Sequence, residues 1–291
     1  FIIIHGDFLN DLQENMKHFS IHFTTWNVGL QNDINGINCV IGNSVRNNSS
    51  ILVFSLQEID DSAKIKDDQV LDSFKFWTDA LQNELQSHYE LKFAENWANS
   101  ALFIFVSKLP EISVEYEYLK SFHILHPRAN NMPLSKASII SFQRINGLNF
   151  AIIGNHLECY DENYAARNSE WLEVLKRASE LSPDYIFIFG DLNYRIELPR
   201  SEVLARIQNH DYKYLLEHDQ LNRGKRENTE LQIFKEGEIT FQPTYKYERN
   251  STNYDQSSLK RIPSYTDRIL FATFNGNQEP QCLEYQPIDC Q

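Results

Sequence analysis

Short apolar runs that stop at polar residues recur along the chain. The runs are four to six residues long, and polar or ionisable side chains follow each within four residues: Ile21–Trp26 is followed by Asn27, Ile51–Leu56 by Gln57 and Glu58, Phe150–Ile153 by Asn155 and His156, and Tyr185–Phe189 by Asp191 and Asn193. Runs of this length and composition are typical of buried strands. They predict strands whose C-terminal ends carry polar side chains, the usual place for ligands in α/β sheets.

Helical periodicity fills the segments between these runs. Apolar residues at helical spacing predict helices over residues 70–86, 164–181 and 200–209, and two more apolar runs predict strands over residues 101–106 and 138–142. The chain is therefore α/β, and it contains no repeat or linker that divides it. Residues 1–20 carry Phe8, Leu9, Leu12, Met16 and Phe19 at helical spacing, which predicts an N-terminal helix or linker before a domain of residues 21–291.

Composition narrows the classes of partner. The 291 residues contain 27 Lys and Arg against 40 Asp and Glu, a formal charge of −13, which disfavours a nucleic-acid binder. The four cysteines have no metal-ligand spacing, so we predict neither a zinc site nor disulfides. No apolar run approaches the roughly 20 residues needed to cross a bilayer. We predict a cytoplasmic monomer without a nucleic-acid partner.

The strand-end residues form a chemically coherent set. Asn27, Glu58, His156, Asp191 and Asn193 supply two carboxylates, an imidazole and two amides. A buried carboxylate needs a partner, a proton or a cation. Glu58 suits Mg²⁺, Asp191 suits an attacking water, and the other side chains suit the oxygens where charge accumulates, which together favour metal-assisted phosphoester hydrolysis. Taken singly, each residue has a plain alternative: a turn Asn, a solvated Glu or a structural His.

Basic residues gather late in this acidic chain. Lys246, Lys260, Arg261 and Arg268 lie within 23 residues, which indicates an anion pocket and makes Arg268 a candidate substrate-binding residue. Two alternatives stay open here. The group is also compatible with a solvated basic edge, and Arg268 with a partner for a buried carboxylate.

Taken with their order, these stretches resemble the inositol polyphosphate 5-phosphatase family. The similarity covers about residues 20–275 and includes seven stretches: Thr25-Trp26-Asn27-Val28, Leu56-Gln57-Glu58, Asn155-His156-Leu157, Arg167-Asn168, Gly190-Asp191-Leu192-Asn193-Tyr194-Arg195-Ile196, Pro243-Thr244-Tyr245-Lys246-Tyr247 and Pro263-Ser264-Tyr265-Thr266-Asp267-Arg268-Ile269-Leu270. The resemblance implies a four-layer α/β sandwich, two mainly antiparallel central sheets flanked by helices. It also implies Mg²⁺-dependent removal of the 5-phosphate from phosphoinositides or soluble inositol phosphates.

The resemblance also implies roles for the central residues. Glu58 would be the metal ligand with Asn27 close by, Asp191 would serve the nucleophilic water, and His156 and Asn193 would hold the scissile phosphate.

Roles at the edge of the site follow in the same way. Tyr245, Lys246 and Lys260 would contact the neighbouring 4-phosphate, and Asp267 would orient a catalytic histidine. Lipid and soluble substrates, and peripheral membrane contact, stay open at this point.

Two departures from the family pattern matter. Where the family has Met-Gly-Asn-Lys-Gly-Gly, residues 131–138 read Asn-Met-Pro-Leu-Ser-Lys-Ala-Ser, which keeps Lys136 as the basic substrate contact but lacks the glycines. The family's closing Ser-Asp-His does not occur in the 291 residues. We therefore expect the chain to lack its last strand. The alternative is a non-catalytic phosphoinositide-binding or scaffold module, and a nuclease of the same fold ranks below both because of the negative charge.

Overall fold

The computed structural model describes most of the chain. It covers residues 19–32, 36–38, 40–41, 48–61, 71–126, 136–248 and 251–288, together with the backbone of residues 2–8.

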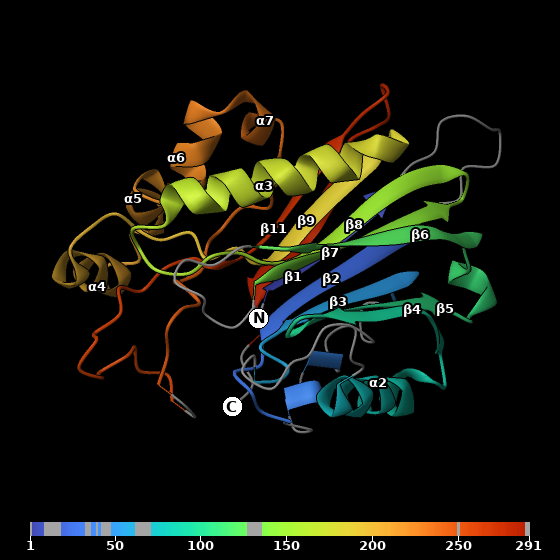
Figure 1. The fold of residues 1–291 in the computed structure, drawn as a ribbon, viewed down its shortest axis with the longest axis horizontal. Coiled ribbons are helices and arrows are strands. Elements are labelled where there is room, and N and C mark those ends of the chain that lie inside the picture. The colour runs from blue at the N-terminus through green and yellow to red at the C-terminus, as the bar shows by residue number, and fades with distance from the viewer. Residues whose placement is uncertain are drawn as a thin grey trace.

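Two six-stranded sheets form the centre of the molecule (Figure 1). The first has the order β12-β1-β2-β3-β5-β4, from β1 (Ile2–Phe8), β2 (Phe19–Asn27), β3 (Ile51–Gln57), β4 (Tyr89–Trp97), β5 (Ser100–Ser107) and β12 (Gln281–Pro287). The second has the order β10-β11-β9-β8-β7-β6, from β6 (Tyr116–Leu125), β7 (Ala137–Ile145), β8 (Leu148–His156), β9 (Tyr185–Asp191), β10 (Lys235–Glu236) and β11 (Asp267–Thr273). The pairs β2–β3 and β8–β9 are parallel, and the other described pairs are antiparallel.

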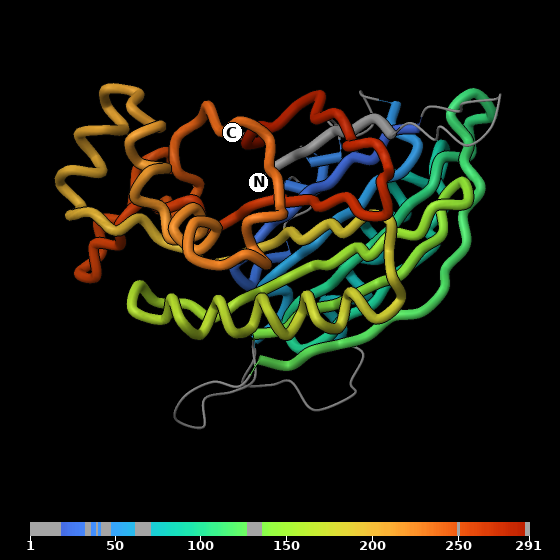
Figure 2. Tube along the Cα trace, turned by 90° about the horizontal axis from the view of Figure 1, so that it is seen from above, coloured from blue at the N-terminus to red at the C-terminus, as the bar shows by residue number. Residues whose placement is uncertain are grey.

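Helices cover the two outer faces. On the first sheet, α2 (Asp72–Leu85) packs Trp77 and Leu81 into one cluster with strand residues such as Phe103. On the second sheet, α3 (Tyr164–Ala178) lies along the outer face, as Figures 1 and 2 show, and is followed by a 3₁₀ turn at Ser179–Leu181. These layers confirm the four-layer α/β sandwich expected from the sequence.

Four further helices are short and gather at one end of the sheets (Figure 1). They are α4 (Arg200–Gln208), α5 (Tyr212–Glu217), α6 (Gln220–Glu227) and α7 (Thr229–Gln232); a 3₁₀ turn at Pro110–Ile112 lies elsewhere. Within the described ranges, no helix combines the length and the apolar composition needed to cross a membrane.

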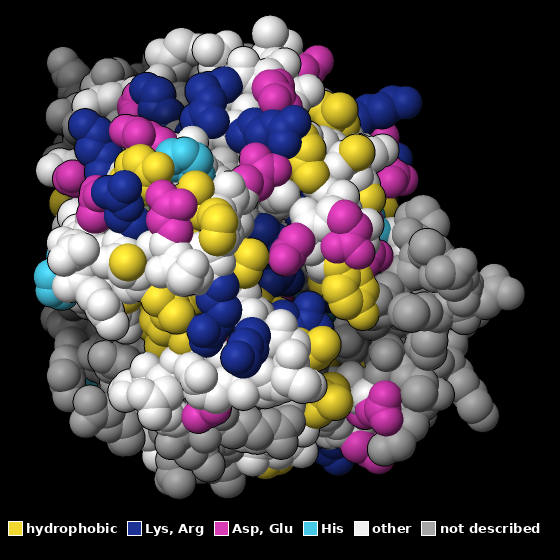
Figure 3. All heavy atoms as spheres, turned by 90° about the vertical axis from the view of Figure 1, so that its left-hand side faces the viewer, with side chains coloured by type: hydrophobic (Ala, Val, Ile, Leu, Met, Phe, Trp, Pro, Cys, Tyr) yellow, Lys and Arg dark blue, Asp and Glu magenta, His cyan; other side chains and the backbone are white. Residues whose placement is uncertain are grey.

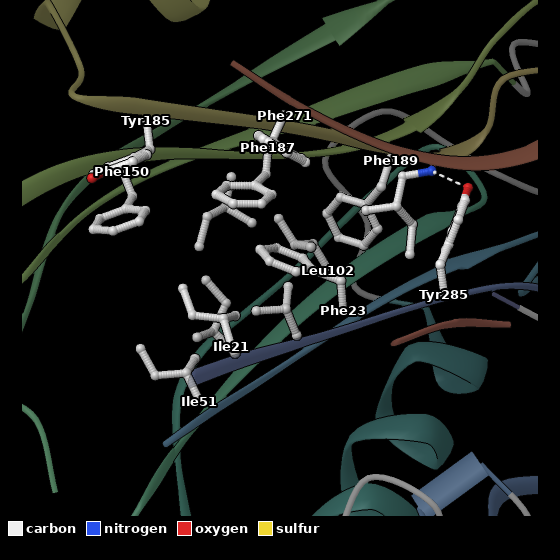
Figure 4. Packing of buried hydrophobic residues seen from close by; sticks show 14 of the residues in the cluster. Ile21, Phe23, Ile51, Leu102, Phe150, Tyr185, Phe187, Phe189, Phe271 and Tyr285 are labelled. Carbon is white, nitrogen blue, oxygen red and sulfur yellow. Dashed lines mark hydrogen bonds between the residues drawn. The ribbon is translucent and has the colours of Figure 1, made fainter. Parts of the chain in front are cut away.

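Aromatic side chains fill the space between the sheets (Figure 4). The rings of Phe23 on β2 and Phe187 on β9 stack with centroids 4.4 Å apart, and Phe189 meets Phe23 edge to face at 5.3 Å. All three are buried, and burial of one such side chain contributes about 1.5–3 kcal/mol. This packing fixes the two sheets against each other, and with them the strand ends of both.

Parallel pairing places the predicted polar residues at one end of the molecule. Asn27 pairs in register with Gln57, which precedes Glu58, and His156 pairs with Asp191. Because the C-terminal ends of parallel strands meet at one edge of a sheet, each sheet presents its polar residues together.

The N-terminus differs from the prediction. Residues 2–8 form β1 rather than a helix, and β1 pairs with β2 and with β12; Ile4, for example, lies opposite Phe23 and Tyr285. Its isoleucines are β-branched and favour strands. Hydrogen bonding to two neighbouring strands then stabilises the extended conformation, although the spacing of the apolar residues is helical. The other positions of the helical pattern, Leu9, Leu12 and Met16, lie outside the described residues. The domain boundary at residue 21 stays a prediction.

Candidate active site

Polar side chains from both sheets converge on Asp191. Asn27 at the end of β2 donates a hydrogen bond from Nδ2 to Asp191 Oδ2 at 3.0 Å. The Nε2 atom of His156 lies 3.7 Å from Asp191 Oδ2 and 4.0 Å from Glu58 Oε1. Four residues predicted separately from strand ends therefore form one cluster, two from each sheet.

The backbone around Asp191 has requirements that the sequence meets. Gly190 has a φ of +135°, and a Cβ there would lie 2.1 Å from the carbonyl oxygen of Asn155, so glycine allows β9 to approach β8. Asn193 has a φ of +57°, a conformation that Asn tolerates better than most residues. Its N–H donates to Asp191 Oδ1 at 3.1 Å. Both carboxylate oxygens of Asp191 are thus held in place.

The environment of Asp191 disfavours its negative charge. Burial and, after it, the nearby carboxylate of Asp267 together raise its pKa to about 7, although Lys136, the amide of Asn27 and Arg195 act to lower it. Such a carboxyl group is suited to accept a proton or to lie beside a cation.

Asp267 lies directly across from Asp191. The two residues pair in the antiparallel ladder of β11 and β9, and the hydroxyls of Thr244 and Thr266 donate to Asp267 Oδ2 at 2.9 and 3.0 Å. Among the described residues, no histidine hydrogen-bonds to Asp267. Its role in orienting a catalytic histidine stays a prediction.

Lys136 retains its place despite the altered loop. It directly precedes β7 and is buried, and its Nζ contacts His156 Nε2. The neighbouring Ala137 pairs with His156 in the β7–β8 ladder, which explains the proximity. Residues 131–135 of the altered loop lie outside the described residues.

Arg195 links the centre to the candidate 4-phosphate contacts, and the sequence reasoning missed it. Its Nη2 donates to Asn193 Oδ1 at 2.6 Å and its Nε to the Asn193 carbonyl at 3.0 Å, while its guanidinium lies 4.2 Å from the centroid of the Tyr245 ring. Asn193 Nδ2 donates to the carbonyl of Leu157 at 2.9 Å, so protein groups engage both ends of this amide. The signal available was the position of Arg195 two residues after Asn193.

The segment with Tyr245 and Lys246 is fixed beside the centre. Tyr245 and Ser264 exchange two backbone hydrogen bonds, of 3.1 and 2.9 Å, which join this segment to the residues before Asp267. Lys246 and Lys260 are exposed. Strands β8 and β9 end on the left of Figure 1, and Figure 3, which faces that side, shows basic side chains gathered in and below a central hollow. Lys246 directly follows Tyr245, whose ring lies against Arg195, so it lies near the centre, and the substrate contacts of both lysines stay predictions.

The assignment of Arg268 as a substrate-binding residue was wrong. Its side chain is 1% exposed, and it donates from Nη1 to Asp219 Oδ1 at 2.9 Å and from Nε to Glu236 Oε1 at 2.6 Å. Arg268 instead neutralises two buried carboxylates, the alternative that the sequence left open. Breaking such a buried arrangement typically destabilises a protein.

The donor set fits a magnesium ion. The Glu58 side chain is 38% exposed, and its Oε1 atom lies 4.0 Å from His156 Nε2, which is itself 3.7 Å from Asp191 Oδ2. Among the described residues, no three His, Cys, Asp or Glu side chains form a complete metal cage. Mg²⁺ is commonly bound through one or two carboxylates and keeps several waters, so Glu58 with Asn27 nearby meets its requirements.

Comparison with known sequences identifies relatives. The model of endonuclease/exonuclease/phosphatase family 2 matches residues 24–291. Synaptojanin from Caenorhabditis elegans is 31% identical over 72% of this chain and 19% of its own length. Phosphatidylinositol 3,4,5-trisphosphate 5-phosphatase 1 from Xenopus laevis is 32% identical over 69% of this chain and 22% of its own length. The chain thus spans about a fifth of each of these curated relatives.

Solved structures show how widely the fold is shared. The inositol polyphosphate 5-phosphatase domain of a synaptojanin, in complex with inositol (1,4)-bisphosphate and calcium, matches with a TM-score of 0.74 and 24% identity over 88% of this chain and 77% of that one. A Cimex nitrophorin, solved as a ferrous NO complex, matches with a TM-score of 0.65 and 18% identity over 89% of this chain and 88% of that one. At such identities the likeness establishes the fold alone. With the family match and the named relatives, the resemblance inferred from the motifs is confirmed, and the chain belongs to endonuclease/exonuclease/phosphatase family 2.

Proposed function

We propose that the chain carries a Mg²⁺-dependent hydrolase that removes the 5-phosphate from phosphoinositides, such as phosphatidylinositol 4,5-bisphosphate, from soluble inositol polyphosphates, or from both. One observation carries the proposal: the carboxylates of Glu58 and Asp191, from different sheets, both lie within 4.0 Å of His156 Nε2. The names of the relatives support the substrate class. We further propose a cytoplasmic monomer that meets membranes peripherally.

The central residues divide the chemistry between them. Asp191 accepts the proton of the attacking water, with its carboxylate oriented by Asn27 and by the N–H of Asn193. Glu58 and Asn27 would hold Mg²⁺, which when bound supplies positive charge to the phosphoryl oxygens. His156 and Lys136 place further hydrogen-bond donors beside Asp191, where those oxygens gain charge.

The edge of the site selects the substrate. Tyr245 stacks on Arg195, Lys246 directly follows Tyr245, and both Lys246 and Lys260 are exposed, so their ammonium groups would contact a phosphate adjacent to the one removed. Such contacts contribute binding in the ground state and the transition state alike, and so act mainly on KM.

Replacing Lys246 by Ala tests this division. We expect KM to rise about tenfold for 4,5-bisphosphorylated substrates, because one charge-assisted hydrogen bond is lost, and to change little for substrates without the 4-phosphate. Steady-state phosphate release on both substrates measures the difference. Lys75→Ala, at an exposed position of α2, is the matched control. Equal effects on the two substrates would remove the 4-phosphate role.

Replacing Arg195 by Lys gives a different kinetic pattern. Arg195 acts as a positioning residue, because it donates two hydrogen bonds to Asn193 while its guanidinium stacks on the Tyr245 ring. Lysine keeps the positive charge but cannot make all three contacts at once. We expect kcat to fall and KM to rise together, each about tenfold, since misplacement by about 1 Å is costly. A change in thermal stability with unaltered kinetics would show that Arg195 only supports the fold.

The rival function is a non-catalytic phosphoinositide-binding module. It is favoured by the altered stretch of residues 131–138, which keeps Lys136 but lacks the glycines of the family pattern. Phosphate release with Mg²⁺, measured on this chain and on any longer product of the same gene, separates the two. Binding of inositol phosphates without release by either protein supports the module.

A further inference from the structure

Large apolar side chains are exposed around the candidate active site. Leu259 is 67% exposed, the highest value among the large hydrophobic residues in the described part of the chain, and Leu30 is 53% exposed. The N–H of Leu30 donates to the carbonyl of Glu58 at 2.8 Å, which places Leu30 at the metal side of the site. Tyr160, 37% exposed, follows His156 by four residues, and the Arg261 guanidinium lies 5.7 Å from its ring centroid. These three exposed apolar side chains, called the apolar surface below, therefore lie on segments next to the candidate site.

The loop that carries Leu259, residues 255–261, is held in one conformation and is called the Leu259 loop below. Asp255 accepts hydrogen bonds from the N–H of Ser257 at 2.9 Å and from the N–H of Arg261 at 3.0 Å. Arg200 donates to the carbonyls of Asp255 at 2.7 Å and Arg261 at 3.3 Å, and the Leu259 N–H donates to the Ser257 hydroxyl at 3.3 Å. The loop thus presents its leucine outward without having to become ordered first.

Positive charge adjoins this leucine. Lys260 and Arg261 follow it directly, and the exposed Lys246 is joined to the loop through its carbonyl, which accepts the N–H of Asp255 at 2.9 Å. Figure 3 shows basic and apolar side chains side by side on this face. The chain as a whole carries −13, so bulk electrostatics cannot draw it to an anionic membrane. An exposed leucine beside local cations is the combination that binds an anionic lipid interface.

We propose that the Leu259 loop docks the opening of the site on an anionic lipid bilayer, with Leu259 in the interface and Lys260 and Arg261 at the headgroups. The consequence for catalysis, which rests on the proposed function, is that lipid-borne substrates are hydrolysed in preference to soluble ones. The docking itself does not depend on turnover.

Sedimentation with vesicles tests the docking. The 291-residue chain is mixed with two kinds of vesicle. One contains phosphatidylcholine alone, and in the other roughly one lipid in four is phosphatidylserine. We expect binding to the anionic vesicles only. Leu259→Ser should weaken that binding about tenfold, because one interfacial leucine is removed. The control Leu172→Ser changes a leucine that is 37% exposed on α3, away from the opening, and should bind like the unaltered chain.

The outcomes are separable. The docking proposal is overturned if Leu259→Ser binds anionic vesicles as well as the unaltered chain does. It is also overturned if the unaltered chain does not bind anionic vesicles, and that result would indicate a protein partner for the apolar surface. Turnover of a soluble inositol polyphosphate by Leu259→Ser should match the unaltered chain, which also shows that the variant is folded. If neither protein hydrolyses any substrate but the vesicle result holds, the proposed function fails and the docking stands.

Discussion

Asp191→Asn is expected to abolish phosphate release while leaving substrate binding nearly unchanged. The amide has the size of the carboxylate but cannot take a proton from water, and general-base catalysis typically contributes about 10²–10⁴-fold. The hydrogen bond from Asn27 and the backbone contact from Asn193 show that the carboxylate is oriented by two sheets. Phosphate release and calorimetric binding of an inositol polyphosphate give the two readouts.

The matched control for this variant is Asp79→Asn, at an exposed position of α2 on the outer layer. It should retain full turnover. Near-normal phosphate release by Asp191→Asn would end the assignment of Asp191 as the base. Loss of binding together with turnover would instead indicate that the carboxylate is needed for the structure of the pocket.

Glu58→Gln is expected to shift the metal dependence as well as the rate. An amide oxygen carries no net charge and is a weaker ligand for a hard cation, so turnover should fall by about 10²–10³-fold at low Mg²⁺ and recover in part as Mg²⁺ is raised. Removal of divalent ions with a chelator should abolish turnover by the unaltered chain, and added Mg²⁺ should restore that turnover. The readout is turnover as a function of Mg²⁺ concentration.

For Glu58→Gln the control is Glu84→Gln, an exposed position near the end of α2. Identical Mg²⁺ curves for Glu58→Gln and the control would show that Glu58 is not the ligand. A loss that no concentration of Mg²⁺ relieves, with the fold retained by circular dichroism, would assign Glu58 to another part of the chemistry.

The grouping of the central residues was predictable because hydrophobic runs fix where strands end. Asn27, Glu58, His156 and Asp191 each follow such a run, and parallel pairing brings neighbouring ends together. Which atoms meet was not predictable, because the bond between Asn27 and Asp191 depends on how the two sheets pack, and that is set by contacts such as Phe23 on Phe187.

The errors have identifiable physical causes. Side chains alternate between the two faces of a strand, so Arg268 points to the face of β11 opposite to that of Asp267. The prediction instead grouped Arg268 with the neighbouring basic residues and did not apply this rule. Strands β4 and β6 were not predicted because they are edge strands with half-exposed, mixed sequences. Residues 2–8 were misassigned because pairing with β2 and β12 outweighs local spacing.

The fold by itself does not decide the chemistry. The synaptojanin domain and the nitrophorin resemble this chain with TM-scores of 0.74 and 0.65, yet one was solved with an inositol bisphosphate and the other as an NO complex. The functional proposal therefore rests on the side chains at the strand ends and not on the fold.

The position of the phosphate that is lost tests the proposed function most directly. Inositol 1,4,5-trisphosphate is incubated with Mg²⁺ and the chain, alongside any longer product of the same gene, and the products are resolved by ³¹P nuclear magnetic resonance. We expect Mg²⁺-dependent loss of the 5-phosphate with the 1- and 4-phosphates retained. Loss of the 1- or 4-phosphate, or no loss by either protein, would contradict it.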